Sequence, residues 1–212
     1  MVKTTEFSTE WKGTINTMSD KNFYAMLSRM RYINRWGLMR NTITENIAEH
    51  SLDVAIIAHG LAIIGNTYFG KNIDSERVAV LAMFHDTTEI ITGDLPTPIK
   101  YFAPEIKNAY KDVEAFAGTQ LLSTLPKELS ENYKDVILPN SKEEELWKYV
   151  KAADKLSALI KCEEEIAMGN MDFAKAKKST EEAVRDMKME EADYFLDNFI
   201  PAYSLTLDES VE

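Results

Sequence analysis

The sequence predicts an all-α protein, a helical bundle of about six main helices. Apolar residues recur every three or four positions through several long segments, which is the spacing of one face of an α-helix. No segment shows the alternation of apolar and polar residues that marks a half-buried strand. Only 8 Gly and 6 Pro occur among the 212 residues, which argues against a many-stranded β protein. The length suits a single domain.

The N-terminal part of the chain changes character twice. Residues 1–20 are polar and lack a steady period, so we expect a flexible tail there. A first helix is expected over 22–33, where the apolar residues share one side. Residues 34–44 are mixed in character and contain Gly37, which indicates a connection.

The clearest helix follows this connection. Asn46 is a suitable N-cap, and Glu49 three residues later completes a capping-box pattern. Gly65 and Asn66 are a suitable end. The predicted buried stripe is Ile47, His50, Val54, Ile57, Leu61 and Ile64.

A second long helix is expected from Asp74 or Ser75 to about residue 90. It places His85 and Glu89 four residues apart on one face, late in the helix. Residues 93–100, with two prolines, are expected to form a loop.

Three further helices are predicted from capping signals. The first begins at Pro104 and ends near Leu125, and a short piece follows after Pro126. The second begins at Ser141, with Glu144 completing a capping box, and ends at Met168–Gly169. The third begins with Asp172 as the cap and ends near Pro201, and an acidic tail is expected over 204–212.

The charge balance excludes several classes of partner. Lys and Arg number 24 and Asp and Glu 35, which gives a net charge of −11. A field of that sign repels nucleic acids and anionic membrane surfaces, although a bound divalent cation can reverse it locally for a small phosphorylated substrate. The acidic runs at 143–145 and 163–165 are expected to be solvated faces.

Cysteine content and hydropathy indicate a cytoplasmic protein. Cys162 is the single cysteine, so no intrachain disulfide forms, and its simplest role is that of a small buried hydrophobe. The most apolar stretch, 54–64, is shorter than a membrane span needs. The first twenty residues lack the pattern of a secretory signal.

Four ionisable residues interrupt otherwise apolar helix faces: His50, the pair His85–Asp86, and Asp154. Burying such groups is costly unless they are paired or bound to metal. If three helices bring them together, the two imidazoles and two carboxylates suit a divalent transition metal such as Co, Mn, Fe, Ni or Zn. The residues alone leave two alternatives open, namely hydrogen-bonded core histidines, and pairing of the aspartate with a neighbouring lysine, Lys151 or Lys155. His59, on the other flank of its helix, is expected to be a satisfied structural histidine.

The order His50, His85–Asp86, Asp154 resembles the signature of the HD-domain phosphohydrolases. The segments NRWGLMRNTITENIAEHSLDVAIIAH, LAMFHDTTEIITGDLPTPIKYF and VKAADKLSALIKCEEE are similar to those of bacterial HD-domain 5′-deoxynucleotidases. The resemblance covers about 22–208 and implies an HD-domain bundle over 21–203. It also implies a metal-dependent enzyme that converts 2′-deoxyribonucleoside 5′-monophosphates to deoxynucleoside and phosphate. The family is dimeric and uses transition metals, cobalt among them.

The resemblance also implies roles for individual residues. The metal ligands are His50, His85, Asp86 and Asp154. Glu89 and Asp94 are implied as the catalytic acid/base residues. The substrate site is implied to comprise Arg35, Trp36, Asp86, Asp94, Leu95, Pro96, Thr97 and Asp154. Trp36 is implied to form the wall against the sugar, where a 2′-hydroxyl would find no hydrogen-bond partner.

Two other functions fit the same residues. A deoxynucleoside triphosphate phosphohydrolase on the same fold needs the same metal site, but it also needs basic groups for three phosphates. Beyond Arg35, Arg40 and Lys100, few stand near the motifs. A non-catalytic, dimeric nucleotide-binding scaffold is the other alternative, and it would need no metal.

Overall fold

The computed structural model describes residues 21–100, 102–138, 140–206 and 208–209. Within these residues the chain is helical and contains no strand. The single β-type pairing that they show is an isolated antiparallel bridge between Asn34 and Asn46. The all-α prediction is confirmed. The tail predicted over 1–20 lies outside the described residues, and the boundaries 21–203 and 204–212 stay predictions.

The α-helices in chain order are α1 (Phe23–Leu27), α2 (Ile47–Tyr68), α3 (Ser75–Phe84), α4 (Glu89–Thr92), α5 (Thr97–Lys100), α6 (Pro104–Leu122), α7 (Lys127–Ile137), α8 (Glu144–Ala167), α9 (Ala174–Arg185) and α10 (Glu190–Asn198). The 3-10 helices are η1 (Ser28–Tyr32), η2 (Ser141–Glu143), η3 (Met171–Phe173) and η4 (Ile200–Ser204).

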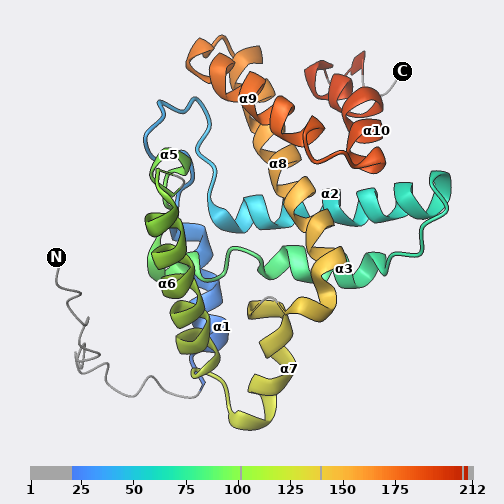
Figure 1. The fold of residues 1–212 in the computed structure, drawn as a ribbon. Helices are drawn as coiled ribbons and strands as arrows, with labels where there is room; N and C mark the ends of the chain where they lie inside the picture. The colour runs from blue at the N-terminus through green and yellow to red at the C-terminus, as the bar shows by residue number, and fades with distance from the viewer. Residues whose placement is uncertain (1–20, 101, 139, 207, 210–212) are drawn as a thin grey trace, which may run out of the picture.

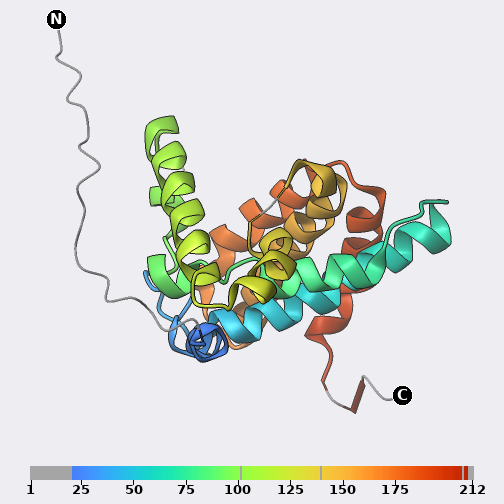
Figure 2. The same cartoon turned by 90° about the horizontal axis from the view of Figure 1, so that it is seen from below.

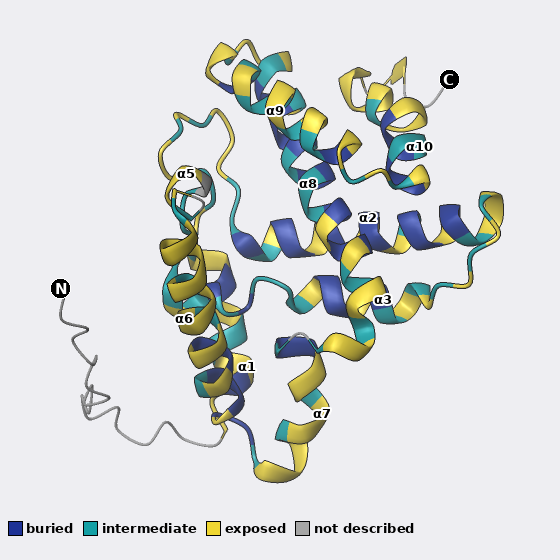
Figure 3. Cartoon of the chain, viewed as in Figure 1, coloured by how far each residue is buried: buried dark blue, intermediate teal, exposed yellow. Residues whose placement is uncertain are grey.

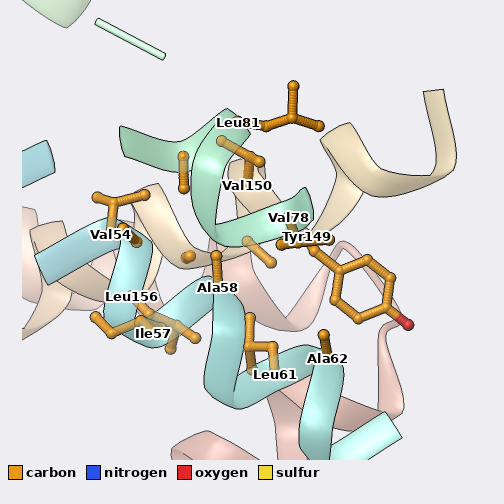
Figure 4. Close-up of a cluster of buried hydrophobic side chains, with 14 of the residues drawn as sticks. Val54, Ile57, Ala58, Leu61, Ala62, Val78, Leu81, Tyr149, Val150 and Leu156 are labelled. Atoms are coloured by element: carbon orange, nitrogen blue, oxygen red, sulfur yellow. The ribbon is translucent and has the colours of Figure 1, made fainter. Parts of the chain in front are cut away.

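The core lies where α2, α3 and α8 meet. In Figure 1, α2 and α3 run side by side and α8 crosses them, while α9 and α10 cover one end. Figure 3 shows the buried residues concentrated along these helices. Figure 4 shows Leu61 of α2, Leu81 of α3 and Leu156 of α8 within one cluster of buried side chains; each is fully buried. Burying side chains of this size contributes about 1.5–3 kcal/mol each, so this junction stabilises the helices that carry the site.

Helix α2 begins as the sequence predicts. The Asn46 side chain accepts from the N–H of Glu49, and the Glu49 side chain accepts in return from the N–H of Asn46. The helix does not stop at Gly65. It continues to Tyr68, because the Asn66 side chain bonds both backbone groups of Ile73 in the next connection.

By length and composition alone, α2 is long and apolar enough to cross a membrane, contrary to the expectation from the 54–64 stretch. More than half of its most apolar window is buried inside the bundle. A central core helix therefore explains its composition. Part of its outer face is nevertheless apolar, since Leu52, Ile56 and Ile63 are all exposed. His59 lies on this face and is exposed, so its predicted structural role is wrong.

The helix predicted from 75 to 90 is broken after Phe84. The hydroxyl of Thr87 donates to the carbonyl of Phe84, and Nδ1 of His85 donates to the carbonyl of Ala82. Side chains that donate hydrogen bonds to these carbonyls compete with the backbone N–H groups that would continue the helix. Tighter turns follow, and the short α4 begins at Glu89.

Other expected boundaries differ for similar local reasons. The first helix is α-helical only to Leu27 and then 3-10, and residues 97–100 form α5 inside the expected loop. Asn140, not Ser141, caps the turn before α8. Asn170, not Asp172, accepts the N-terminal hydrogen bond before α9, and the predicted last helix divides into α9 and α10. The predicted stop after Met168 is confirmed, with Gly169 at φ 84°.

Helix α6 lies at one side of the bundle (Figure 2). Its buried residues are confined to its C-terminal end: Ala117, Gly118, Leu121 and Leu122. Its N-terminal half contacts the segment between α4 and α5, since the hydroxyl of Tyr110 donates to the carbonyl of Gly93.

Candidate metal and substrate site

Two histidines face one another in the interior. His50 lies in the first turn of α2 and is fully buried, and His85 is the C-cap of α3. Their ring centroids are 5.3 Å apart. Nδ1 of His85 lies 2.7 Å from the carbonyl oxygen of Ala82, and Nδ1 of His50 lies 3.1 Å from the hydroxyl of Ser157. Because a carbonyl only accepts, Nδ1 of His85 carries a hydrogen, which leaves Nε2 to face the site.

Two carboxylates complete the cluster. The Oδ2 atom of Asp86 lies 3.1 Å from Nε2 of His85 and 3.6 Å from Nε2 of His50. The Oδ1 atom of Asp154, on α8, lies 3.1 Å from Nε2 of His50. One atom each from His50, His85 and Asp86 lies within 4.8 Å of the others. The four residues that the sequence singled out thus come together from three parts of the chain.

This cluster fits a divalent cation. Neither histidine Nε2 has a hydrogen-bond partner, although both are buried. A neutral imidazole nitrogen facing a carboxylate oxygen brings two acceptors together, so each contact needs a proton or a cation between the atoms. Fixing Nδ1 by a second partner is also how ligating histidines are usually oriented. Two imidazoles and two carboxylates suit a divalent transition metal.

The pKa values in the cluster follow from burial and from these neighbours. Burial lowers the pKa of His50 to about 4. Burial also opposes charging of His85, but the adjacent Asp86 outweighs it and raises the pKa of that ring. Burial opposes ionisation of Asp86 and Asp154 as well, yet the two histidines hold both carboxyl pKa values below their usual range. The carboxylates are therefore ionised at neutral pH and available to a cation.

Glu89 and Asp94 lie on the next turn of chain. Glu89 opens α4 and is buried, with one carboxyl oxygen lacking a partner. Burial, reinforced by the negative charges of Asp86 and Asp94, raises its pKa to about 9. Burial likewise raises the pKa of Asp94, whose carboxylate accepts a hydrogen bond from the backbone N–H of Trp36. The break after α3, not one continuous helix face, sets the position of Glu89.

Arg35 supplies the positive charge of the site. Its Nη1 lies 4.0 Å from both Asp86 and Asp154, and its side chain is only 13% exposed. Neither its Nε nor its Nη1 has a hydrogen-bond partner. A buried guanidinium with free donors beside the cluster is suited to bind a phosphate.

Trp36 has a left-handed backbone conformation with φ 59°. Its ring packs on Phe173 with centroids 5.3 Å apart, and its Nε1–H donates to Glu45 over 2.9 Å. A left-handed conformation costs a non-glycine residue about 1–2 kcal/mol. The surrounding contacts therefore maintain it.

The other predicted lining residues lie between α4 and α5. Leu95 and Pro96 are half-buried, and the carbonyl of Pro96 accepts from the N–H groups of Ile99 and Lys100. Thr97 opens α5, and its side chain lies outside the described part of the structure. The substrate-lining role of these residues stays a prediction.

Several residues around the site were not anticipated. Glu45 contacts the Arg35–Trp36 pair, and Ser157 orients His50. Lys161 and Glu165 bind the loop that carries Arg35 and Trp36. One sequence signal could have found three of them, because Asp154, Ser157, Lys161 and Glu165 follow a helical 3-4-4 spacing as a polar stripe on α8. Glu165 is 1% exposed, so the expected solvated face at 163–165 is wrong for this residue.

Comparison with known proteins agrees with this geometry. The sequence model of the YfbR-like 5′-deoxynucleotidases matches residues 22–203. A 5′-deoxynucleotidase of Vibrio vulnificus is 49% identical over 192 residues, which cover 91% of this chain and 99% of the relative. One from Photorhabdus temperata is 50% identical over 188 residues, covering 89% and 95%.

The chain belongs to the YfbR-like 5′-deoxynucleotidase family. The resemblance stated from the HD signature and the surrounding segments is confirmed.

Solved structures agree on the fold of this family member. An HD-domain phosphohydrolase from Listeria innocua superposes with a TM-score of 0.75 at 23% identity, covering 86% of this chain and 88% of the other. The HD phosphohydrolase of cyanophage S-2L, described as bound to dA and one catalytic Zn²⁺, gives 0.61 at 20% identity, covering 84% and 95%. The HD-domain helical bundle is thereby confirmed.

Proposed function

We propose that this YfbR-like protein hydrolyses 2′-deoxyribonucleoside 5′-monophosphates to deoxynucleoside and phosphate with a divalent transition metal. The observation that carries the proposal is the meeting of His50, His85, Asp86 and Asp154 around two buried imidazole nitrogens without partners. These four residues would hold the ion. When bound, it supplies Lewis acidity that lowers the pKa of water and neutralises phosphate charge.

Arg35 is assigned to the phosphate. The chain carries a net charge of −11, so a dianionic substrate needs a local positive group. The guanidinium lies beside two of the proposed ligands and has unused donors. Its planar fork can hold two phosphate oxygens at once, which both binds and orients the group.

Glu89 and Asp94 are assigned to proton movement. Because its pKa is raised to about 9, Glu89 holds a proton at neutral pH when no cation is nearby. A cation among the neighbouring carboxylates offsets the charge of Asp86 that helps to raise this pKa. Glu89 is therefore suited to exchange a proton with the attacking water. Asp94, whose pKa is also raised, is assigned to protonate the leaving 5′ oxygen.

Trp36 is assigned to the sugar. A flat indole against C2′ offers no partner to a 2′-hydroxyl, and burying an unpaired hydroxyl costs about 1–3 kcal/mol. Leu95, Pro96 and Thr97 are assigned to the remaining wall of the nucleotide site.

The test is phosphate release from dAMP, AMP and dATP with added Co²⁺ or Mn²⁺, and with a chelator. We expect release from dAMP, little from AMP, and loss of activity with the chelator. Release of triphosphate or pyrophosphate from dATP with dAMP untouched would move the assignment to a triphosphohydrolase. No turnover together with no bound metal would overturn the catalytic assignment.

We further propose a cytoplasmic homodimer. The buried single cysteine, Cys162, suits a reducing compartment. The dimer is supported by the family resemblance and by the exposed apolar residues Leu52, Ile56 and Ile63 on α2, which a second copy would cover. Light scattering after gel filtration tests the dimer, and a monomeric mass at micromolar concentration would overturn it.

A further inference from the structure

Glu45 lies where the loop that carries Arg35 and Trp36 is closed. The backbone N–H of Arg35 donates to the carbonyl of Glu45 over 2.9 Å, and Asn34 and Asn46 pair in the isolated bridge. The chain between Asn34 and Asn46 makes an eleven-residue excursion over 35–45. Glu45 therefore sits directly across from the two residues assigned to phosphate and sugar.

The carboxylate of Glu45 contacts both of those residues. Its Oε2 accepts from Nε1–H of Trp36 over 2.9 Å and lies 3.4 Å from Nε of Arg35. Its Oε1 lies 3.9 Å from Nδ1 of His50, on the ring side away from the proposed metal. The side chain is 12% exposed. One carboxylate thus joins the sugar wall, the guanidinium and a proposed ligand.

The indole of Trp36 has two supports that involve its ring. Phe173 packs against it, and Glu45 takes its only donor. Packing alone permits an aromatic ring to turn about χ2, whereas a hydrogen bond from Nε1 selects one orientation. Loss of the acceptor would leave the indole N–H without a partner in a half-buried place, which favours reorientation.

We propose that Glu45 is a positioning residue that sets the discrimination between deoxyribose and ribose by fixing the indole of Trp36 and the guanidinium of Arg35. This inference rests on the proposed deoxynucleotidase function. Glu45 is not assigned to the phosphate, the sugar or the ion. It acts through its two neighbours, so its loss changes which substrate is accepted, not only how fast the enzyme works.

The first experiment compares kcat and KM for dAMP and AMP in wild type, Glu45→Gln and Glu45→Ala. Glutamine keeps an oxygen for Nε1–H, so discrimination in kcat/KM stays within about threefold of wild type, while KM rises for both substrates because Arg35 loses its anionic partner. Alanine lowers discrimination by about tenfold, as expected when a pocket wall loses its fixed orientation. Glu76→Gln is the control, because Glu76 is exposed on α3, away from the loop that Glu45 closes, and should leave both substrates unaffected.

A double-mutant cycle with Trp36→Phe tests whether Glu45 acts on discrimination through the indole of Trp36. Phenylalanine keeps a ring but lacks the donor, so it should lower discrimination by itself, and Glu45→Ala should then add little. Metal content per chain, measured by elemental analysis, should match wild type in every variant. If Glu45→Ala does not fold, Glu45→Met, which fills a similar volume without offering an acceptor to Nε1–H, replaces it in the same comparison and in the same cycle.

The outcomes separate the two proposals. Unchanged discrimination in the folded Ala variant, or a full Ala effect in the Trp36→Phe background, overturns the positioning role alone. In the Ala variant, equal losses for dAMP and AMP show a merely structural role and also overturn it. Failure of the wild type to hydrolyse dAMP overturns the proposed function and this inference with it.

Discussion

Two buried glutamates in this molecule have opposite surroundings. Glu165 on α8 is 1% exposed, and its carboxylate accepts from the backbone N–H groups of Thr42 and Ile43 and from the side chains of Asn170 and Lys161. Burial would raise its pKa, but these donors hold it well below the usual range. Glu89 is 7% exposed and one of its oxygens has no partner, so burial raises its pKa to about 9.

The difference indicates that the surroundings of Glu165 stabilise the fold, whereas those of Glu89 are suited to bind a ligand. Buried polar atoms are normally paired in folded proteins. Among the described residues, nine buried side-chain atoms lack a partner, and five of them belong to Arg35, His50, His85 and Glu89. Around Glu165, protein donors satisfy the charge, whereas around Glu89 the missing partners are those that a cation and a phosphate would supply.

The largest expected effect is on catalysis, from Glu89→Gln. The amide keeps the shape but does not exchange a proton at neutral pH, so kcat for dAMP should fall by about 10²–10⁴-fold. Bound metal, measured by elemental analysis, should be retained. Glu76→Gln, an exposed substitution on α3, is the control. Activity within about twofold of wild type would remove Glu89 from the mechanism.

The next effect is on stability, from Glu165→Ala. The change strands the buried ammonium of Lys161 and two backbone N–H groups, so the free energy of unfolding should drop by about 3–5 kcal/mol. Urea denaturation of the metal-free protein measures it, with the exposed neighbour Glu164→Ala as control. A loss no larger than that of the control would show that the donors around Glu165 contribute nothing net.

The smallest effect is a pair of opposite pH dependences in the metal-free protein. The folded pKa of Glu89, about 9, exceeds its usual 4.5, so the native state holds the extra proton between these values. The stability that this group contributes is present below about pH 4.5 and is lost as pH rises through about 9. Relative to Glu89→Gln, wild type should lose about 2–4 kcal/mol between about pH 5 and 8.

Glu165 provides the opposite case. Its folded pKa is lowered, so its contribution is present above the unfolded pKa and is lost as pH falls. The stability difference between wild type and Glu165→Gln should therefore shrink on acidification. Thermal unfolding across pH measures both differences, and slopes of the same sign would contradict the contrast between the two glutamates.

Much of the fold and of the candidate site could be predicted because these features depend on residues close together in the sequence. The capping box of Asn46 and Glu49 is decided by neighbours three residues apart. The four proposed ligands stood out because ionisable groups interrupt apolar faces. The break after Phe84 could not be predicted, because it depends on which carbonyl the side chains of His85 and Thr87 reach.

The all-α class, the starts of α2, α3 and α6, the family and the identity of the candidate ligands could all be predicted from the sequence, since periodicity, capping and motif spacing are local patterns. Which acidic residues are buried, and which partners they contact, depends instead on long-range packing. Glu163, Glu164 and Glu165 read alike in sequence, yet only the last is buried, because a loop 123 residues earlier in the chain covers it. Glu45 likewise gains its partners from the way that the loop closes. Helical spacing fixes the direction in which a side chain points, but long-range packing chooses the partner that it meets.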